Sequence, residues 1–201
     1  LPMASVVDNL NDLTETREQL KQVWSPFQTR HLGALNTVSQ SKVKSIPRGD
    51  MRGCRRAKGT RVAIIVENGD GKYGRSFLYC PTSGTTLQLP NCWSNPHFAC
   101  TRSVLAAVVT TSTLHEGQYR IIVDDVLMFN GANVAEQPFG ARWRNLEATA
   151  NNLIEDDLSW PHASPCDVVI LKATFQPLRK CHKLAAFPHP DQVTSGLTIV
   201  H

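Results

Sequence analysis

The sequence predicts an α+β protein built mostly on antiparallel β-sheet, with a few helices. Three observations lead to this fold class. Apolar residues alternate with a period of two in several segments after residue 60. Asn-Gly and Asp-Gly pairs, which favour hairpin turns, follow some of these segments. A helical spacing of three or four residues is confined to residues 4–24 and 141–155.

The first predicted element is an amphipathic helix within residues 4–24. Its apolar positions lie three or four apart among Asp, Asn, Glu and Lys residues. We treat residues 1–30 as a separate N-terminal helical segment and a docking element for protein partners. A polar stretch then leads to the basic cluster of residues 48–61, RGDMRGCRRAKGTR.

The remaining elements are mainly strands. The turn at residues 68–74 predicts one hairpin and the polar turn at 115–118 predicts a second. Asn130-Gly131 is expected to turn the chain into a further short strand. In chain order, the predicted strands are residues 61–68, 75–80, 103–111, 119–129, 133–137, 167–175 and 197–200.

Composition places broad limits on function. The chain has 201 residues, of which 41% are hydrophobic, and a net charge of +4, which permits an anionic partner without requiring one. No apolar run reaches the length of about 18 residues that a membrane span needs, so we expect no membrane partner. Six cysteines without a C-x-x-C pair argue against a zinc site and favour reduced thiols in the nucleus or cytoplasm.

Two adjacent carboxylates, Asp124 and Asp125, lie inside the predicted strand 119–129. Side chains alternate along a strand, so the two should point to opposite faces. We expect Asp125 to face inward near the Gly59 turn, with a backbone amide or Arg61 as its donor, and Asp124 to point away. The alternative is an edge strand on which both charges oppose unwanted pairing.

The segment from Arg120 to Arg142 resembles a motif of the covalent nucleotidyltransferases, above all the mRNA capping guanylyltransferases. The matching residues are Arg120, Asp125, Phe129, Asn130, Gly131, Pro138, Phe139 and Arg142. The resemblance implies a nucleotidyltransferase-like, ATP-grasp-like domain over residues 31–201, with antiparallel sheets flanking a central groove. It also implies that the domain is incomplete at its C-terminus.

Weaker versions of other family motifs lie at suitable distances. Residues 56–61, RAKGTR, resemble the nucleotide-attachment motif K-x-D-G-x-R, and residues 35–39 resemble its upstream Gln-Pro-Val-Ser. Residues 105–109 stand where the family has its acidic D-G-E motif. Residues 195–199, SGLTI, resemble the E-G-L-I-F strand.

The departures from these motifs point away from catalysis. Arg56 replaces the nucleophilic lysine, and a guanidinium stays protonated and cannot attack phosphorus. Val108 and Ser195 replace carboxylates that would hold a divalent metal. Asp124 replaces the aromatic residue that stacks on the purine. The chain is in this respect similar to the snurportin cap-binding domain, a non-catalytic relative.

The resemblance therefore implies a non-catalytic module that binds an RNA 5′ cap or 5′ end, within a ribonucleoprotein or import complex. We expect no catalytic residue, cofactor or metal. The ligand-binding residues that it implies are Arg56, Lys58, Gly59, Arg61, Asp125 and Arg142.

The basic cluster adds Arg48, Arg52 and Arg55 as contacts to RNA phosphates. A solvated basic loop is the alternative interpretation of this cluster. Two other functions remain open. The first is that of a structural subunit in a larger RNA–protein assembly. The second is that of an active capping guanylyltransferase that uses Lys58 as its nucleophile.

Overall fold

The computed structural model describes Glu18 and residues 51–67, 75–89, 102–114, 116–153, 168–186 and 194–200. The predicted N-terminal segment, residues 1–30, lies outside the described residues apart from Glu18. Arg48 and the motif at residues 35–39 lie outside them as well.

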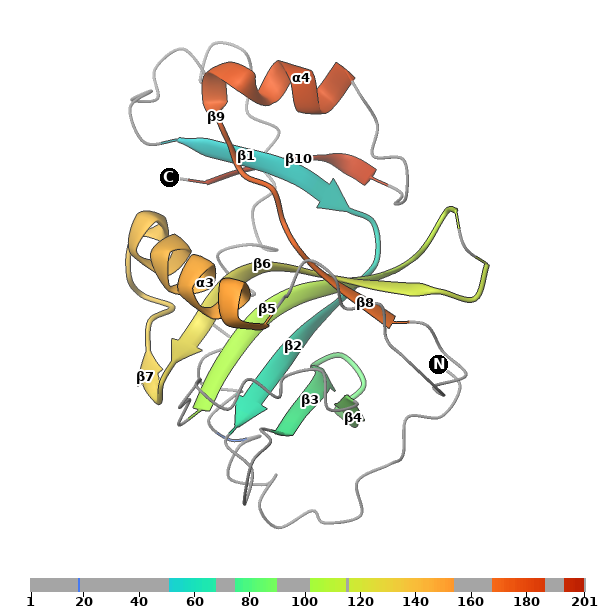
Figure 1. Ribbon diagram of the computed structural model, residues 1–201, viewed down its shortest axis with the longest axis vertical. Coiled ribbons are helices and arrows are strands. Elements are labelled where there is room, and N and C mark those ends of the chain that lie inside the picture. The colour runs from blue at the N-terminus through green and yellow to red at the C-terminus, as the bar shows by residue number, and fades with distance from the viewer. Residues whose placement is uncertain are drawn as a thin grey trace.

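The described chain forms a main sheet of seven strands in the order β4-β3-β2-β5-β6-β7, with β8 beside β6 (Figure 1). The strands are β2 (Thr60–Glu67), β3 (Arg75–Cys80), β4 (Thr85–Leu89), β5 (Arg102–Thr111), β6 (Tyr119–Phe129), β7 (Ala132–Asn133) and β8 (Val168–Lys172). Every pair is antiparallel except β6 with β8. The mostly antiparallel α+β prediction is confirmed.

The parallel pair requires a crossover, which α3 (Phe139–Leu153) provides. Pro138 precedes the helix, and its carbonyl accepts from the amides of Ala141 and Arg142. The helix predicted at residues 141–155 therefore exists, displaced by about one half-turn.

A second, smaller sheet lies on one side of the main sheet (Figure 1). Its central strand is β1 (Arg52–Ala57), between β10 (Thr194–Val200) and β9 (Gln176–Pro177). The 3-10 helix η1 (Leu178–Lys180) and the helix α4 (Cys181–Ala186) follow β9, and α4 packs against β1 and β10. Residues 52–57 of the basic cluster thus form a strand, which the sequence pattern does not predict.

Both predicted hairpins are present: β2 pairs with β3, and β5 pairs with β6. Asn130 and Gly131 have φ angles of 47° and 81°, so this pair makes the left-handed turn expected of Asn-Gly. The strand predicted at residues 133–137 is wrong beyond Asn133. The Asn133 side chain accepts from the Ala135 amide, and this local bond replaces strand pairing.

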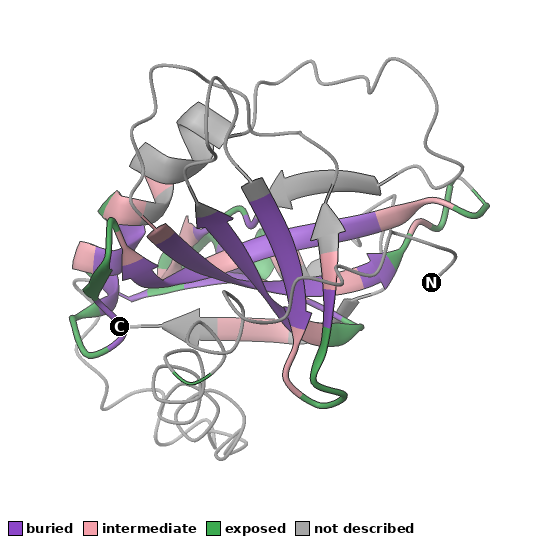
Figure 2. Cartoon of the chain, turned by 90° about the horizontal axis from the view of Figure 1, so that it is seen from below, coloured by how far each residue is buried: buried purple, intermediate pink, exposed green. Residues whose placement is uncertain are grey.

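The core is centred on β2, β5 and β6, whose central residues are buried (Figure 2). Alternate residues of β2 divide between two hydrophobic clusters: Val62, Ile64 and Val66 in one, and Ala63 and Ile65 in the other. Each face of this sheet is therefore covered.

Asp124 lies at a break in the pairing of β5 with β6. Ala106 opposes Asp125 and Ala107 opposes Val123, which leaves Asp124 as the extra residue of a β-bulge. Strict alternation fails at a bulge. The register puts Asp125 on the same face as Ile122, and Asp124 lines the same hollow as Ile122. The expectation that Asp124 and Asp125 point to opposite faces is therefore wrong.

Candidate functional site

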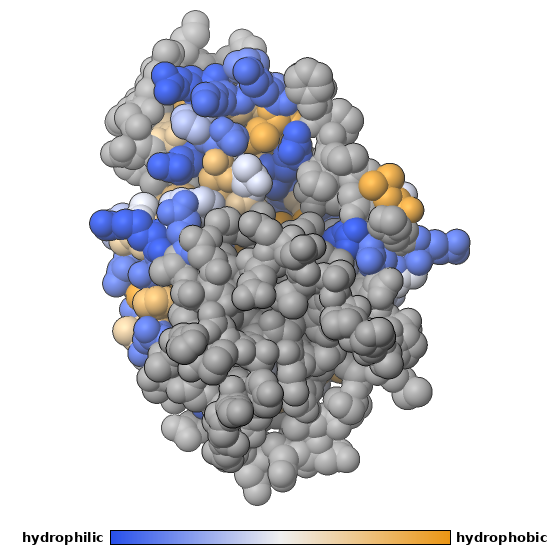
Figure 3. Space-filling model, viewed as in Figure 1, coloured by the Kyte–Doolittle hydropathy of each residue, from blue (hydrophilic) through white to orange (hydrophobic). Residues whose placement is uncertain are grey.

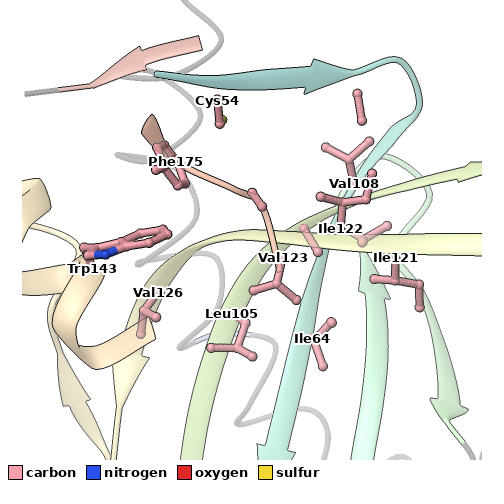
Figure 4. Close-up of a cluster of buried hydrophobic side chains, with 14 of the residues drawn as sticks. Cys54, Ile64, Leu105, Val108, Ile121, Ile122, Val123, Val126, Trp143 and Phe175 are labelled. Atoms are coloured by element: carbon pink, nitrogen blue, oxygen red, sulfur yellow. The ribbon is translucent and has the colours of Figure 1, made fainter. Parts of the chain in front are cut away.

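A hollow of about 110 Å³ lies where β1 and β10 approach the main sheet. Four charged side chains line it: Arg55, Arg56, Arg61 and Asp124. Its apolar wall includes Val108 and Ile122, which point towards β1 (Figure 4). Segments that are distant in the sequence therefore meet at this hollow.

The turn between β1 and β2 forms one rim of the hollow. A Cβ atom on Gly59 would lie 2.0 Å from the carbonyl oxygen of Val109, so the backbone of this turn approaches β5 too closely for any side chain. This close approach fixes the turn on the end of β5. It thereby positions Arg56 before the turn and Arg61 after it.

Strand register explains why Arg61 reaches the hollow. Arg61 opposes Val108, and Val108 opposes Ile122, so these residues form one row across β2, β5 and β6. Residues in one row share a face of the sheet. Arg61 is thus the polar end of a row whose other members are buried.

Arg61 forms an ion pair with Asp124 inside the hollow, in which its Nη1 donates to Oδ2. Both side chains are largely buried, with 18% and 24% of their areas exposed. Asp124 lies two residues after Ile122 on β6, so ordinary strand alternation places its carboxylate on the face that lines the hollow. Of the two donors expected for Asp125, Arg61 pairs with the neighbouring Asp124, whereas a backbone amide, that of Val126, does donate to Asp125.

The pKa of the Cys54 thiol, on β1, depends on the charges of this site. Burial raises the pKa of its thiol, the carboxylate of Asp124 raises it further and the guanidinium of Arg61 lowers it, with a net pKa of about 12. The thiol is 3% exposed. It therefore stays protonated at neutral pH and is part of the core.

Asp125 and Arg142 are brought together elsewhere, as a buried pair. The Arg142 Nε and Nη2 atoms donate to the two Asp125 oxygens at 2.8 and 3.0 Å, and the Val126 amide donates to Oδ1 at 2.8 Å. Arg142 also donates to the carbonyls of Ala135 and Gln137. Asp125 faces inward as expected, but this pair joins α3 to β6 and does not line the hollow.

The other predicted site residues are dispersed. Arg55 lines the hollow and also donates from Nε to the Leu184 carbonyl at 3.3 Å. Arg52 is exposed and does not line the hollow. Lys58 lies on the turn but lines a different cavity, on the opposite face of the main sheet.

That second cavity is a cleft of about 850 Å³. Its floor is apolar, with Val62, Leu78, Leu87 and Val109 among its lining residues, and hydroxyl groups lie around them. Val62 and Val109 alternate with the residues of the row that faces the hollow, so cleft and hollow lie on opposite faces. Gly59 borders both.

Cys80 also lines this cleft. Burial alone would raise the pKa of its thiol, but hydrogen bonds from the Ser83 hydroxyl and from the Ser83 and Thr82 backbone lower the pKa below its usual value of 9.0. Such a thiol is more readily ionised than the one of Cys54. Cys54, Cys80 and Cys181 are free thiols.

Hydrophilic residues gather on the surface of the small sheet and α4 (Figure 3). Arg52 on β1, Arg179 and Lys180 on η1 and Lys183 on α4 are exposed. These cations lie on packed elements, since α4 contacts β1. Basic charge is therefore also present on the outside of the small sheet.

The strand predicted at residues 197–200 lies within β10, but sequence reasoning missed the role of Asp124 and the pairing of β10 with β1. Thr198 lines the hollow because β10 pairs with β1. The weak signal for this strand is the SGLTI segment, which places β10 beside the RAKGTR segment. No sequence signal marks the bulge that shifts the pairing register at Asp125.

No protein-family model matches this chain. No curated protein matches its sequence either. Among the described residues, no helix has the length and hydropathy to cross a membrane, and no group of three or more His, Cys, Asp or Glu side chains is arranged to hold a metal.

Proposed function

We propose that the protein is a non-catalytic, guanylyltransferase-like module that binds an RNA 5′ end. The observation that carries this proposal is the convergence of Arg55, Arg56 and Arg61 on one hollow. Arginine guanidinium groups are suited to phosphate recognition because they are permanently charged and donate several hydrogen bonds in one plane.

The arrangement of the motif positions supports the guanylyltransferase resemblance. Arg56, at the position of the attachment lysine, lines the same hollow as Val108 and Asp124. Val108 stands at an acidic motif position and Asp124 at the aromatic one. Gly196, in the segment that resembles E-G-L-I-F, opposes Arg56 across β1 and β10. Four separate segments that the resemblance selects thus meet at one place.

The chemistry of these residues favours binding without catalysis. Arg56 cannot be the nucleophile of nucleotidyl transfer. Lys58 is the alternative nucleophile, but it lines the cleft on the opposite face of the sheet from the arginines. A lysine that attacks a phosphate must lie on the side where the phosphate is held.

The exposed cations beyond the hollow support a polyanionic ligand larger than one phosphate group. Arg52, Arg179, Lys180 and Lys183 are placed on the outside of the small sheet and its helices. An RNA strand that extends from the hollow around the edge of the small sheet would meet these cations. Such contacts contribute affinity that depends on salt rather than on base sequence.

Binding of a fluorescently labelled RNA to two single variants tests the proposal. Arg56→Ala removes a cation that lines the hollow, and Arg52→Ala removes one from the same strand that does not. We expect Arg56→Ala to weaken binding by about tenfold or more, since a hydrogen bond to a charged group contributes about 1.5 to 3 kcal/mol. Arg52→Ala should weaken it by less. Equal effects of the two variants would contradict a site in the hollow.

A second candidate function is a structural role in a larger RNA–protein assembly. The cleft of about 850 Å³ favours it, because an apolar floor of this size suits an anchor from another molecule. The same measurement separates the two candidates. If Arg56→Ala leaves RNA binding unchanged, the structural role becomes the better account.

A further inference from the structure

We infer that the hollow accepts a single terminal phosphate group of an uncapped RNA 5′ end. In the absence of RNA, the Asp124 carboxylate binds the Arg61 guanidinium, and the phosphate replaces this carboxylate when RNA binds. The inference rests on the proposed function and makes its ligand more specific. It concerns the size of the hollow and the identity of the carboxylate inside it.

Size excludes a whole nucleotide from the hollow as the structure has it. Its volume of about 110 Å³ is well below the roughly 300 to 1,000 Å³ of pockets that enclose drug-sized ligands. A phosphate group has only five heavy atoms and is small enough to enter. A methylguanosine cap would have to place a base and a ribose beyond the bridging phosphates.

The lining agrees with this choice. A cap base needs an aromatic surface for stacking, which contributes about 1 to 3 kcal/mol per base in other complexes. The described lining residues of the hollow include no aromatic side chain. They include the guanidinium groups of Arg55, Arg56 and Arg61, whose chemistry suits a phosphate oxygen.

Asp124 shows where such a phosphate would be held. Its carboxylate accepts from Arg61 Nη1 inside the hollow, and an anionic oxygen is the group that a phosphate would present to the same donor. A ligand must therefore compete with Asp124 for Arg61. Both side chains are partly exposed, so the exchange requires no opening of the core.

Ligand charge decides this competition. A terminal phosphate group carries up to two negative charges, whereas a phosphodiester carries one and is blocked on both sides. Arg55 and Arg56 add positive charge around the same hollow. A 5′-triphosphate should displace Asp124 readily, and an RNA with a 5′-hydroxyl should bind only through the outer cations.

The test uses one oligonucleotide with a 5′-triphosphate, a 5′-hydroxyl or a methylguanosine cap, titrated against the full chain. We expect the triphosphate form to bind about tenfold more tightly than the other two. Asp124→Asn and Asp124→Ser should each strengthen binding of the triphosphate form severalfold and leave the hydroxyl form unchanged. Glu116→Gln, which removes an exposed carboxylate on the β5–β6 turn, is the control and should change neither.

The possible failures are distinguishable. Equal binding of the three RNA forms, still weakened by Arg56→Ala, would overturn the terminal-phosphate inference and leave the proposed function standing. Tighter binding of the capped form would also overturn it. If the variants of Asp124 fold as the wild type does by thermal melting but do not change affinity, the exchange on Arg61 is wrong. If none of the three RNA forms binds, the proposed function itself fails.

Discussion

Asp125 on β6 and Arg142 on α3 form a buried ion pair with two parallel hydrogen bonds, of 2.8 and 3.0 Å. The two side chains are 4% and 9% exposed. A geometry of this kind satisfies both carboxylate oxygens at once. It joins the crossover helix to the central sheet.

Removing one partner of this pair should be costly. We expect Arg142→Met to lower the free energy of unfolding by about 3 to 5 kcal/mol, because the Asp125 carboxylate is then buried without its cation. Arg144→Met is the matched control, since Arg144 is exposed on the same helix. Its effect should stay within about 0.5 kcal/mol. Urea denaturation followed by circular dichroism measures the free energy of unfolding of both variants. Similar losses in the two variants would show that the buried pair stabilises the fold no more than an exposed arginine does.

The Gly59 turn makes a second prediction. Gly59→Ala would place a Cβ 2.0 Å from the Val109 carbonyl oxygen, so the turn must move away from β5. We expect a loss of about 1 to 3 kcal/mol in the free energy of unfolding. Gly140→Ala in α3 meets no atom within 4 Å and should be neutral or stabilise by up to about 1 kcal/mol. A stable Gly59→Ala protein would show that the close approach is not required.

The Cys54 thiol makes the free energy of unfolding depend on pH in the alkaline range. Its thiol has a pKa of about 12 in the folded chain against an ordinary value of 9.0. Between these values the unfolded chain loses a proton that the folded chain keeps, so stability falls as pH rises. Below pH 9 the contribution does not change with pH.

The expected slope is a loss of about 1.4 kcal/mol per pH unit above pH 9, from this group alone. Comparison with Cys54→Ala isolates it, because other groups that titrate are common to both proteins. Parallel stability curves for the two proteins between pH 9 and 11 would contradict the buried, protonated thiol.

Cys80 should be the more reactive of these two thiols. Because hydrogen bonds from the turn lower its pKa, its alkylation by iodoacetamide should reach half of the maximal rate below pH 9.0. Ser83→Ala removes the side-chain donor and should shift that midpoint to higher pH. Mass spectrometry of the two peptides follows each cysteine separately, with Cys54 as the unreactive reference. Equal rates at both cysteines would show that the turn does not stabilise the thiolate.

Much of the sheet could be predicted because its signals are local. Apolar alternation and Asn-Gly or polar turns predict β2, β3, β5 and β6 and their hairpins, which the register confirms. In the small sheet, the strand predicted at residues 197–200 lies within β10, whereas the central strand could not be predicted in this way. Its strand β1 has the sequence RGCRRA, in which cations occupy strand positions, and it forms because β10 and β9 pair with it from far along the chain.

Part of the candidate site was predictable because its residues lie close together in the sequence. Arg56, Gly59 and Arg61 lie within one short motif, and the structure brings them to one hollow. The face on which Asp125 lies depends on a bulge, which is a property of the pairing between two strands and leaves no mark in the composition of either. Arg142 depends on the position of α3 relative to β6. These non-local arrangements decide which aspartate meets which arginine.

The salt dependence of RNA binding tests the central claim most directly. Each phosphate contact contributes about 0.7 to the slope of log affinity against log salt for a single strand. Replacing Arg55 and Arg56 together with Ala should therefore flatten the slope for a 5′-triphosphorylated RNA by about 1.4, whereas Arg52→Ala should flatten it by no more than about 0.7. A slope that the double variant leaves unchanged, in a protein that melts like the wild type, would contradict phosphate binding in the hollow.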